Sequence, residues 1–388
     1  MSTLRTSALA PGSVQSEIRA MSLLSEAAGG INMSQGICDT EVPAVVRDEA
    51  NAAIRNGNNI YTRLDGIARL RAAIAADWGK RHNLTLDPDR EIMVTSGATG
   101  ALYASAMALL DPGDEVILFE PGYGYHANTL RSMRVEPVIV PLDYGSWSLN
   151  IEAVRAALTP KTRAILINTP SNPCGKVFTR AELTALAELA IERDLFVFSD
   201  EIYEHFIYPG HQHISIATLP GMRARTITFS GFSKTYSVTG WRVGYVVADA
   251  KWLPSFGYFH DLVYICAPAP FQHGCAAGLE QLPQSFYADL AADHDRKRLQ
   301  TMAALADAGL TPHNPDGAYY ILADATPLRG ATAAEKARDL LARTGVAAVA
   351  GSAFFRKGGG ENLLRFCFGK RDADLDEACR RLRALAQS

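Results

Sequence analysis

The 388-residue sequence lacks the signals that mark several classes of protein. It has no excess of one charge, since 38 Lys and Arg stand against 41 Asp and Glu, a formal net charge of -3. No apolar run approaches the roughly 18 residues of a membrane span, and residues 1–12 lack the apolar core of a signal peptide. We therefore expect a cytoplasmic protein without a nucleic-acid or membrane partner, whose ligands are small molecules.

Cysteine is also scarce, and no two cysteines form a CxxC pair. The six are Cys38, Cys174, Cys266, Cys275, Cys367 and Cys379. A chain of this length does not need disulfides to fold, so we expect reduced thiols. The sequence has neither an HExxH nor a GxSxG motif, and the pair His211 and His213 is too small a cluster for a metal site. A metal or thiol hydrolase is therefore not favoured, and we expect no metal.

What the sequence does contain is an alternation of β-rich runs and helical segments between Glu91 and Ala248. The runs are IMVTS, EVILFE, VEPVIVPL, RAILIN, LFVFSDE, RTITFS and VGYVVA. Strands separated by helices predict βαβ units and an α/β fold with a mostly parallel sheet flanked by helices. In such a sheet the ligand lies beyond the carboxyl ends of the strands, so the residues that follow each run are the candidates for chemistry.

Beyond Pro270 this alternation weakens, which predicts a second, smaller α+β domain. A long helix is expected over residues 284–308 and another over residues 333–344, followed by the run LLRFCFG and a charged C-terminal helix. We predict a large domain at residues 45–283, a small domain formed by residues 13–44 and 284–388, and an N-terminal arm at residues 1–12.

Lys234 follows the apolar run RTITFS within Ser230-Gly-Phe-Ser-Lys234. Burial at the tip of a strand disfavours the ammonium form, and the neutral amine is a nucleophile for an aldehyde. An exposed, solvated lysine is the alternative reading. The position therefore suits Schiff-base chemistry only if its surroundings support it.

A turn that can bind phosphate follows the first run of this region. Gly97, Ala98 and Thr99 open an apolar helix, where free backbone N–H groups face an anion, and Arg242 and Ser230 can add donors. Glycine and threonine also occur in such turns for steric and capping reasons alone. By itself the turn is weak evidence for a phosphate.

Four further side chains at strand tips match an aromatic cofactor. Asp200 ends an apolar run, where a carboxylate needs a partner such as a protonated pyridine nitrogen. Tyr203 and Asn172 offer a hydroxyl and an amide to a ring oxygen, and Tyr123 can stack on the ring. Each has an ordinary alternative as a helix cap, a turn residue or a core aromatic, but together these alternatives are improbable.

Taken in order, Tyr61, SGATG, PGY, NTPSNPCG, SDEIY, SGFSK and GWRVG resemble the class I/II, fold-type I aminotransferases that use pyridoxal 5'-phosphate. The resemblance spans nearly the whole chain, and the best match is the branch of aspartate, aromatic, kynurenine and methionine aminotransferases. It implies that Lys234 carries the cofactor, that Arg365, Gly36 and Asn172 bind the substrate, and that Tyr61 reaches the neighbouring active site of a homodimer.

Two positions depart from this branch. Cys38 stands where a proline usually follows the Gly36 segment, which predicts a less rigid loop and a differently shaped side-chain pocket. Thr99 stands where the dicarboxylate-specific bacterial enzymes often have lysine, which argues against aspartate as substrate. The amino donor therefore stays open.

The expected reaction moves the α-amino group of an L-amino acid to a 2-oxo acid. Lys234 is expected to act as general base and acid, and storage of the amino group between substrates implies ping-pong kinetics. A β-eliminating lyase or a cyclising biosynthetic enzyme of the same fold is the alternative, because carbanion stabilisation does not dictate the outcome. A non-catalytic regulatory domain that binds the cofactor is disfavoured, since the sequence has no basic helix-turn-helix extension.

Overall fold

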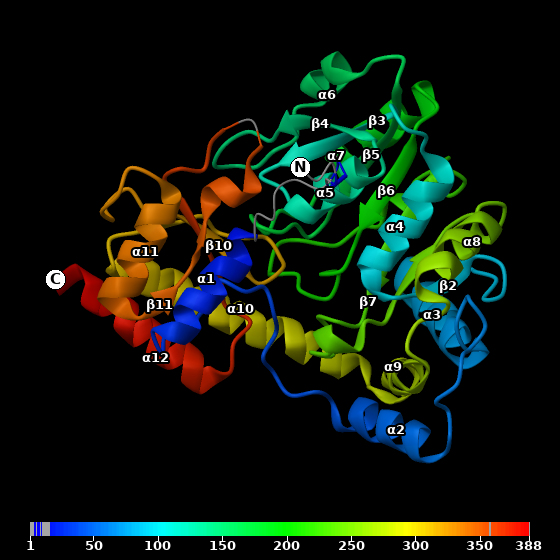
Figure 1. The fold of residues 1–388 in the computed structure, drawn as a ribbon, viewed down its shortest axis with the longest axis horizontal. Helices are drawn as coiled ribbons and strands as arrows, with labels where there is room; N and C mark the ends of the chain where they lie inside the picture. Colours follow the sequence, from blue (N-terminus) through cyan, green and yellow to red (C-terminus); the bar gives the residue numbers. More distant parts are fainter. Residues whose placement is uncertain (1–3, 5, 8, 10–15, 357, 388) are drawn as a thin grey trace.

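The computed structural model describes residues 16–356 and 358–387, together with residues 4, 6, 7 and 9 (Figure 1). The helices are α1 (Glu17–Ala27), α2 (Ala44–Arg55), α3 (Ala68–His82), α4 (Gly97–Leu109), α5 (Gly124–Ser132), α6 (Ile151–Ala157), α7 (Arg180–Glu192), α8 (Leu253–Tyr264), α9 (Ala269–Gln281), α10 (Gln284–Asp307), α11 (Ala333–Thr344) and α12 (Asp372–Arg383). No helix in this described part is long and apolar enough to cross a membrane.

A seven-stranded sheet forms the centre of the larger lobe. Its strands are β2 (Ile92–Thr95), β3 (Glu115–Glu120), β4 (Glu136–Pro141), β5 (Thr162–Asn168), β6 (Phe196–Asp200), β7 (Thr226–Gly231) and β8 (Gly244–Val247). Their order is β2-β8-β7-β6-β5-β3-β4, and all neighbours are parallel except the two pairs that involve β8. The seven predicted runs and the mostly parallel sheet are confirmed.

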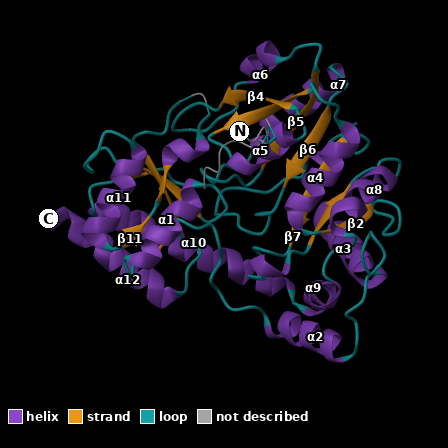
Figure 2. Cartoon of the chain, viewed as in Figure 1, coloured by secondary structure: helices purple, strands orange, loops and turns teal. Residues whose placement is uncertain are grey.

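Helices cover both faces of this sheet, as Figure 2 shows. Successive residues of a strand point to opposite faces, so Val116 and Leu118 of β3 pack with α4, α5 and α8, while Ile117 and Phe119 pack with α6 and α7. Both faces are buried, which explains why the strands read as continuous apolar runs. The α/β fold with helices on either side of the sheet is thereby confirmed.

The smaller lobe carries two short sheets. One pairs β1 (Ile31–Asn32) with β11 (Val346–Ala347), and the other has the order β12 (Val349–Ala350), β13 (Leu363–Cys367), β10 (Tyr320–Asp324), β9 (Thr311–Pro312). Helices α1, α10, α11 and α12 pack beside them around one buried cluster (Figure 1). Helix α10 is 24 residues long and leads from the α9 region into this lobe.

Local sequence signals set several helix ends. Thr179 and Glu182 form a capping box at α7, and Thr332 and Glu335 form one at α11, so two orphan N–H groups are satisfied at each start. Helix α11 ends at Gly345 in the left-handed conformation, which glycine adopts without strain. Helix α11 therefore has the bounds that the sequence predicted.

The predicted domain boundaries follow the same division of sheets. The seven-stranded sheet lies inside residues 45–283, and the two short sheets fall in residues 31–32 and 311–367. The boundaries themselves stay a prediction. Most of the predicted N-terminal arm and the boundary at residue 13 lie outside the described residues.

Candidate functional site

A cavity of about 380 Å³ opens at the carboxyl ends of β5, β6 and β7. This is the edge of a parallel sheet where connecting loops leave room for a ligand. The lining comes from both lobes: α1, the segment 35–37, the start of α4, the α5 region, the tips of the three strands, and Tyr320 and Arg365 of the smaller lobe. The lobes therefore share one site.

Lys234 lies at the floor of this cavity, three residues beyond β7. Its Nζ donates to the Gly36 carbonyl at 2.9 Å and lies 6.0 Å from the centre of the Tyr203 ring. Burial lowers the pKa of Lys234 to about 8, and the nearby Arg242 and Arg365 act in the same direction. The expected desolvated amine is therefore present, with a much larger neutral fraction near neutral pH than an exposed lysine has.

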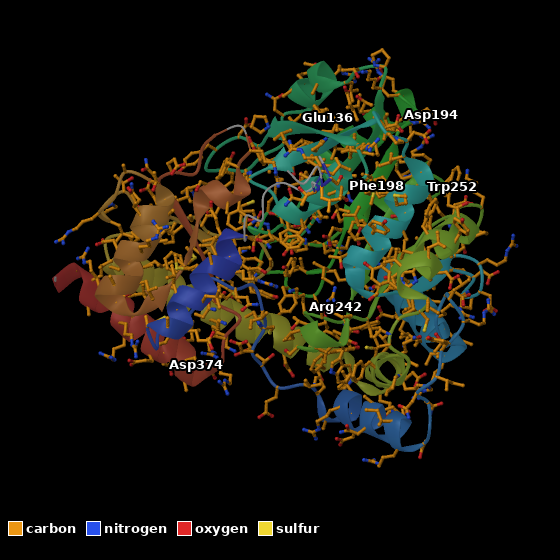
Figure 3. The ribbon with its side chains drawn as sticks, viewed as in Figure 1. Glu136, Asp194, Phe198, Arg242, Trp252 and Asp374 are labelled. Atoms are coloured by element: carbon orange, nitrogen blue, oxygen red, sulfur yellow. The ribbon has the colours of Figure 1, made fainter. Side chains whose placement is uncertain are left out.

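The predicted phosphate turn packs against Arg242 at one end of the cavity. Arg242 Nη2 donates to Thr99 Oγ1 at 3.0 Å, and a Cβ on Gly97 would lie 2.5 Å from the same nitrogen. Gly97 has φ +70°, a conformation that favours glycine. Figure 3 labels Arg242 near the middle of the molecule, between the two lobes. The helix start and the guanidinium thus form one cationic cradle.

Asp200 ends β6 and is 6% exposed. Its Oδ2 lies 2.8 Å from His126 Nε2, and its Oδ1 accepts from the Ile202 N–H at 3.2 Å. His126 was not among the predicted residues. The available signal was its spacing, since it lies three residues after Tyr123 on the first turn of α5, where its ring meets Tyr123 edge-on at 5.3 Å. The carboxylate is thereby held in place by two donors.

Two buried tyrosines meet beside Lys234. The hydroxyls of Tyr203 and Tyr320 are 2.8 Å apart, and burial raises the pKa of both phenols. Tyr320 also explains the glycine at position 36, because a Cβ there would lie 2.2 Å from the Tyr320 hydroxyl. Tyr320 was not among the predicted site residues, and its place in the cavity was missed.

Arg365 extends from β13 and is fully buried. Its Nη1 donates to Asn172 Oδ1 at 2.9 Å, its Nη2 donates to the Ser34 carbonyl, and its guanidinium lies 4.5 Å from the centre of the Tyr320 ring. The Nε has no hydrogen-bond partner among the described residues. A buried guanidinium in the wall of a cavity is suited to bind a carboxylate.

The structure brings most of the predicted site residues together. Those that line the cavity are Gly36, Ala98, Thr99, Tyr123, Asn172, Asp200, Tyr203, Lys234, Arg242 and Arg365. Gly97 lies directly behind them against Arg242. Tyr61 does not line the cavity of this single chain and is 75% exposed.

Ser230 requires a correction. Its hydroxyl donates to Glu204 Oε1 at 2.8 Å, it is 1% exposed, and it does not line the cavity. Successive side chains of β7 point to opposite faces of the sheet, and that of Ser230 points to the face where Glu204 lies. Ser233, which directly precedes Lys234, lines the cavity instead. The Ser230 prediction is therefore wrong, because sequence spacing alone did not show which serine faces the site.

Comparison with known proteins places this geometry in a family. Residues 28–382 match the model of the family described as aminotransferase class I and II. The chain belongs to the class I and II aminotransferases. The match covers both lobes and all of the cavity lining except α1 and its cap, which precede residue 28. The predicted family and its transaminase activity are confirmed, and no relative favours the lyase or cyclising alternative.

Several relatives of this aminotransferase have named activities. A probable N-succinyldiaminopimelate aminotransferase of Mycobacterium tuberculosis is 36% identical over 378 residues, covering 95% of each chain. Kynurenine–oxoglutarate transaminase 3 of mouse is 34% identical, covering 90% of this chain and 83% of the relative. The solved M. tuberculosis N-succinyldiaminopimelate aminotransferase has a TM-score of 0.94 at 35% identity, covering 98% of this chain and all of that one. The substrates named for these relatives differ.

One cluster of the aminotransferase has the composition of a metal site. Ligand atoms of Glu201, Glu204 and His213 lie within 4.8 Å of one another. Glu204 accepts from Arg81, Ser230 and Tyr245. Burial raises the pKa of its carboxyl, but the charge of Arg81, helped by His205, His213 and the Ser230 hydrogen bond, outweighs this and holds the pKa well below the usual range. His213 lies 2.9 Å from Glu201. The hydrogen bonds of both carboxylates make this a buried ion-pair network, and His213 is part of it rather than an isolated loop residue.

Proposed function

We propose that this aminotransferase binds pyridoxal 5'-phosphate covalently at Lys234 and uses it to move the α-amino group of an L-amino acid to a 2-oxo acid. The observation that carries the proposal is the buried amine of Lys234 between a cationic cradle and a buried carboxylate. The spacing of these groups along strand tips matches what the cofactor needs: an amine for its aldehyde, donors for its phosphate and an acid for its ring nitrogen.

The phosphate end is assigned to the start of α4 and to Arg242. The first N–H groups of a helix have no partner within the helix, so those of Gly97, Ala98 and Thr99 are available to an anion. Arg242 adds a full positive charge beside Thr99. The hydroxyl of Ser233 takes the place that the sequence had given to Ser230.

The ring end is assigned to Asp200, held by His126. A buried carboxylate beside a ring nitrogen keeps that nitrogen protonated. Tyr203 and Asn172, which line the cavity, would hydrogen-bond the phenolic oxygen, and Tyr123, next to His126, would stack on the ring face. When bound, the cofactor supplies an electron sink for the pair left at Cα after proton loss.

Substrate binding is assigned to Arg365, Asn172 and Gly36. The Arg365 guanidinium donates to the α-carboxylate, with Asn172 holding its orientation. The Lys234 amine would take the proton from the substrate Cα as general base and give it up again as general acid. The keto acid leaves and a second 2-oxo acid enters, which gives ping-pong kinetics.

We further propose a cytoplasmic homodimer. An apolar surface formed by the 60–64 loop and the end of α8 is strongly exposed: Ile60, Tyr61, Leu64, Tyr258, Leu262 and Val263 are between 42% and 80% exposed. A contiguous surface of this kind marks a protein interface. Burial of this surface in a second copy would bring Tyr61 to the neighbouring site. All six cysteines are free, which suits a reducing compartment.

The deciding experiment combines attachment with turnover. Purified protein is loaded with pyridoxal phosphate, reduced with borohydride and digested; the cofactor mass is expected on the Lys234 peptide and absent from Lys234→Ala. A panel of L-amino acids is then mixed with the loaded protein, and conversion of the bound cofactor to its amine form is followed by absorbance. Attachment elsewhere, or a panel in which no amino acid converts the cofactor, contradicts the proposal.

A further inference from the structure

Helix α1 gives one face to the cavity that contains Lys234. The residues of α1 and its cap that line it are Ser16, Ile18, Arg19, Ser22, Leu23 and Glu26. At about 100° per residue, positions 18, 19, 22, 23 and 26 fall within an arc of about 140°. Met21 and Ser25 lie on the adjoining stripe and are buried, Met21 in the core of the smaller lobe. The orientation of α1 is therefore fixed by packing.

Arg19 lines the cavity with a positively charged side chain that the proposed function does not use. Lys234, Arg242 and Arg365 are already engaged with Gly36, Thr99 and Asn172. Positions three and four residues from Arg19 are Gln15, Ser16, Ser22 and Leu23, so no acid neutralises it along the helix. Within the described residues its guanidinium has neither an ion-pair nor a hydrogen-bond partner.

The walls assigned to the cofactor and to the α-carboxylate leave the α1 side of the cavity open to the substrate side chain. The phosphate cradle at α4, the carboxylate at β6 and Arg365 at β13 are each occupied in the proposed function. On the small-lobe and α5 sides the lining without an assigned role is α1, Gln35, Ile37, Tyr125 and Thr129; on the large-sheet side it is Leu102, Asn168, Ile202, Phe229 and Thr239. The α1 side carries the charged Arg19 together with the polar Gln35 and Thr129, so a polar substrate side chain is taken to leave Cα toward α1.

From this arrangement we infer that Arg19 binds a carboxylate at the end of the substrate side chain and so favours dicarboxylic amino acids and 2-oxo acids. The inference rests on the proposed function for the position of the α-carboxylate. Residue 99 is a threonine, so α4 offers no lysine to this second carboxylate. Arg19 on α1 offers a positive charge to it instead. Glu26, about 10 Å along the helix from Arg19, disfavours anions that extend further.

The test compares two five-carbon acids that differ only in the second carboxylate. Binding of glutarate and of pentanoate to the protein saturated with pyridoxal phosphate is measured by calorimetry for the wild type, Arg19→Met and Arg19→Lys. The wild type is expected to bind glutarate about 10-fold more tightly than pentanoate, Arg19→Met to lose this preference and Arg19→Lys to keep part of it. Arg47→Met, an exposed arginine on α2 outside the cavity, serves as matched control and keeps the preference.

The outcomes separate this inference from the proposed function. A glutarate preference that survives Arg19→Met, or an equal loss for both acids, overturns the role of Arg19 even if the enzyme transaminates. A preference that depends on Arg19 in a protein that converts no amino acid supports the inference and contradicts the proposed function. Turnover is the second readout: Arg19→Met is expected to lower kcat/KM for glutamate about 10-fold and to leave that for glutamine unchanged.

Discussion

Lys234 shows how one buried side chain can favour chemistry at a cost in stability. The fold removes its ammonium from water, so the folded protein holds the proton less tightly than the unfolded chain does. Unfolding then takes up a proton in the range between the two pKa values, and the free energy of unfolding depends on pH there. The lowered pKa of Lys234 can therefore be measured in the cofactor-free protein from the pH dependence of unfolding.

We expect Lys234→Met to flatten this dependence. In the cofactor-free wild type, the contribution of Lys234 to the free energy of unfolding rises as pH increases from about 8 to the ordinary 10.5, because only the unfolded lysine binds a proton there. The difference amounts to roughly 3 kcal/mol across the range. Urea unfolding at several pH values measures it, with the exposed Lys251→Met as control. Parallel curves for wild type and Lys234→Met would show that the lysine is not desolvated.

A substitution at Asp200 tests the proposed partner of the cofactor ring nitrogen. Asp200→Asn keeps the size of the side chain and removes the charge opposite His126, so the cofactor ring loses its acid partner. The rate of the half-reaction is expected to fall about 100-fold or more, while the protein stays folded and retains cofactor. Asp194→Asn makes the same change at an exposed carboxylate paired with Arg225, and its rate should equal that of the wild type. Equal rates for the two variants would remove Asp200 from the mechanism.

At the scale of elements, the start of α4 is positioned by contact with β8. A Cβ on Gly244 would lie 2.5 Å from the carbonyl carbon of Gly97 and 2.6 Å from the Ala98 nitrogen. The strand therefore approaches the helix closely enough that even a methyl group does not fit. Since that first turn is also the proposed phosphate cradle, packing between two elements determines the geometry of the site.

Gly244→Ala is expected to displace this turn. We predict a loss of about 1–3 kcal/mol in the free energy of unfolding from overpacking, together with weaker binding of pyridoxal phosphate. Denaturant unfolding of the cofactor-free protein and cofactor titration measure the two effects. Gly240→Ala is the matched control, because nothing lies within 4 Å of the added methyl group there. If both variants bound the cofactor as the wild type does, the close contact would not hold the cradle in place.

At the scale of the whole molecule, two lobes contribute to one cavity and an apolar surface lies outside it. The large lobe supplies Lys234, Asp200 and Arg242, and the small lobe supplies Tyr320 and Arg365. Leu64 contacts α8 at Gly257, so the 60–64 loop and the helix present one surface. In a dimer formed through this surface the site and the interface would be continuous.

Leu262→Glu places a charge in that surface, where the side chain is 64% exposed in the single chain. We expect the proposed dimer to dissociate to monomers in this variant, because burial of an unpaired carboxylate is costly. Sedimentation velocity measures the change. Leu299→Glu, on α10 and 54% exposed, makes the same substitution away from the surface and should leave the dimer intact. A Leu262→Glu protein that sediments with the wild type would move the interface elsewhere.

The sequence by itself determined the strands of the large sheet, the extent of α11 and the residues at the strand tips. These depend on signals that are local in the chain: apolar runs, capping boxes, and glycines in turns. Lys234, Asp200 and Asn172 follow such signals directly, and the structure gathers them because the carboxyl ends of parallel strands share one edge. Arg242 precedes β8, which runs antiparallel to β7, so the start of β8 lies at the same edge.

Only the tertiary structure decided which neighbours face the cavity. Whether Ser230 or Ser233 reaches it depends on how β7 ends, and His126 enters the site because α5 lies against the tip of β6. The family resemblance pointed to Arg365, but its complete burial and its unpartnered Nε follow from the packing of β13 on β10. Orientation across elements results from long-range packing, which spacing along the chain does not encode, and Arg19 on α1 gains its proposed role for the same reason.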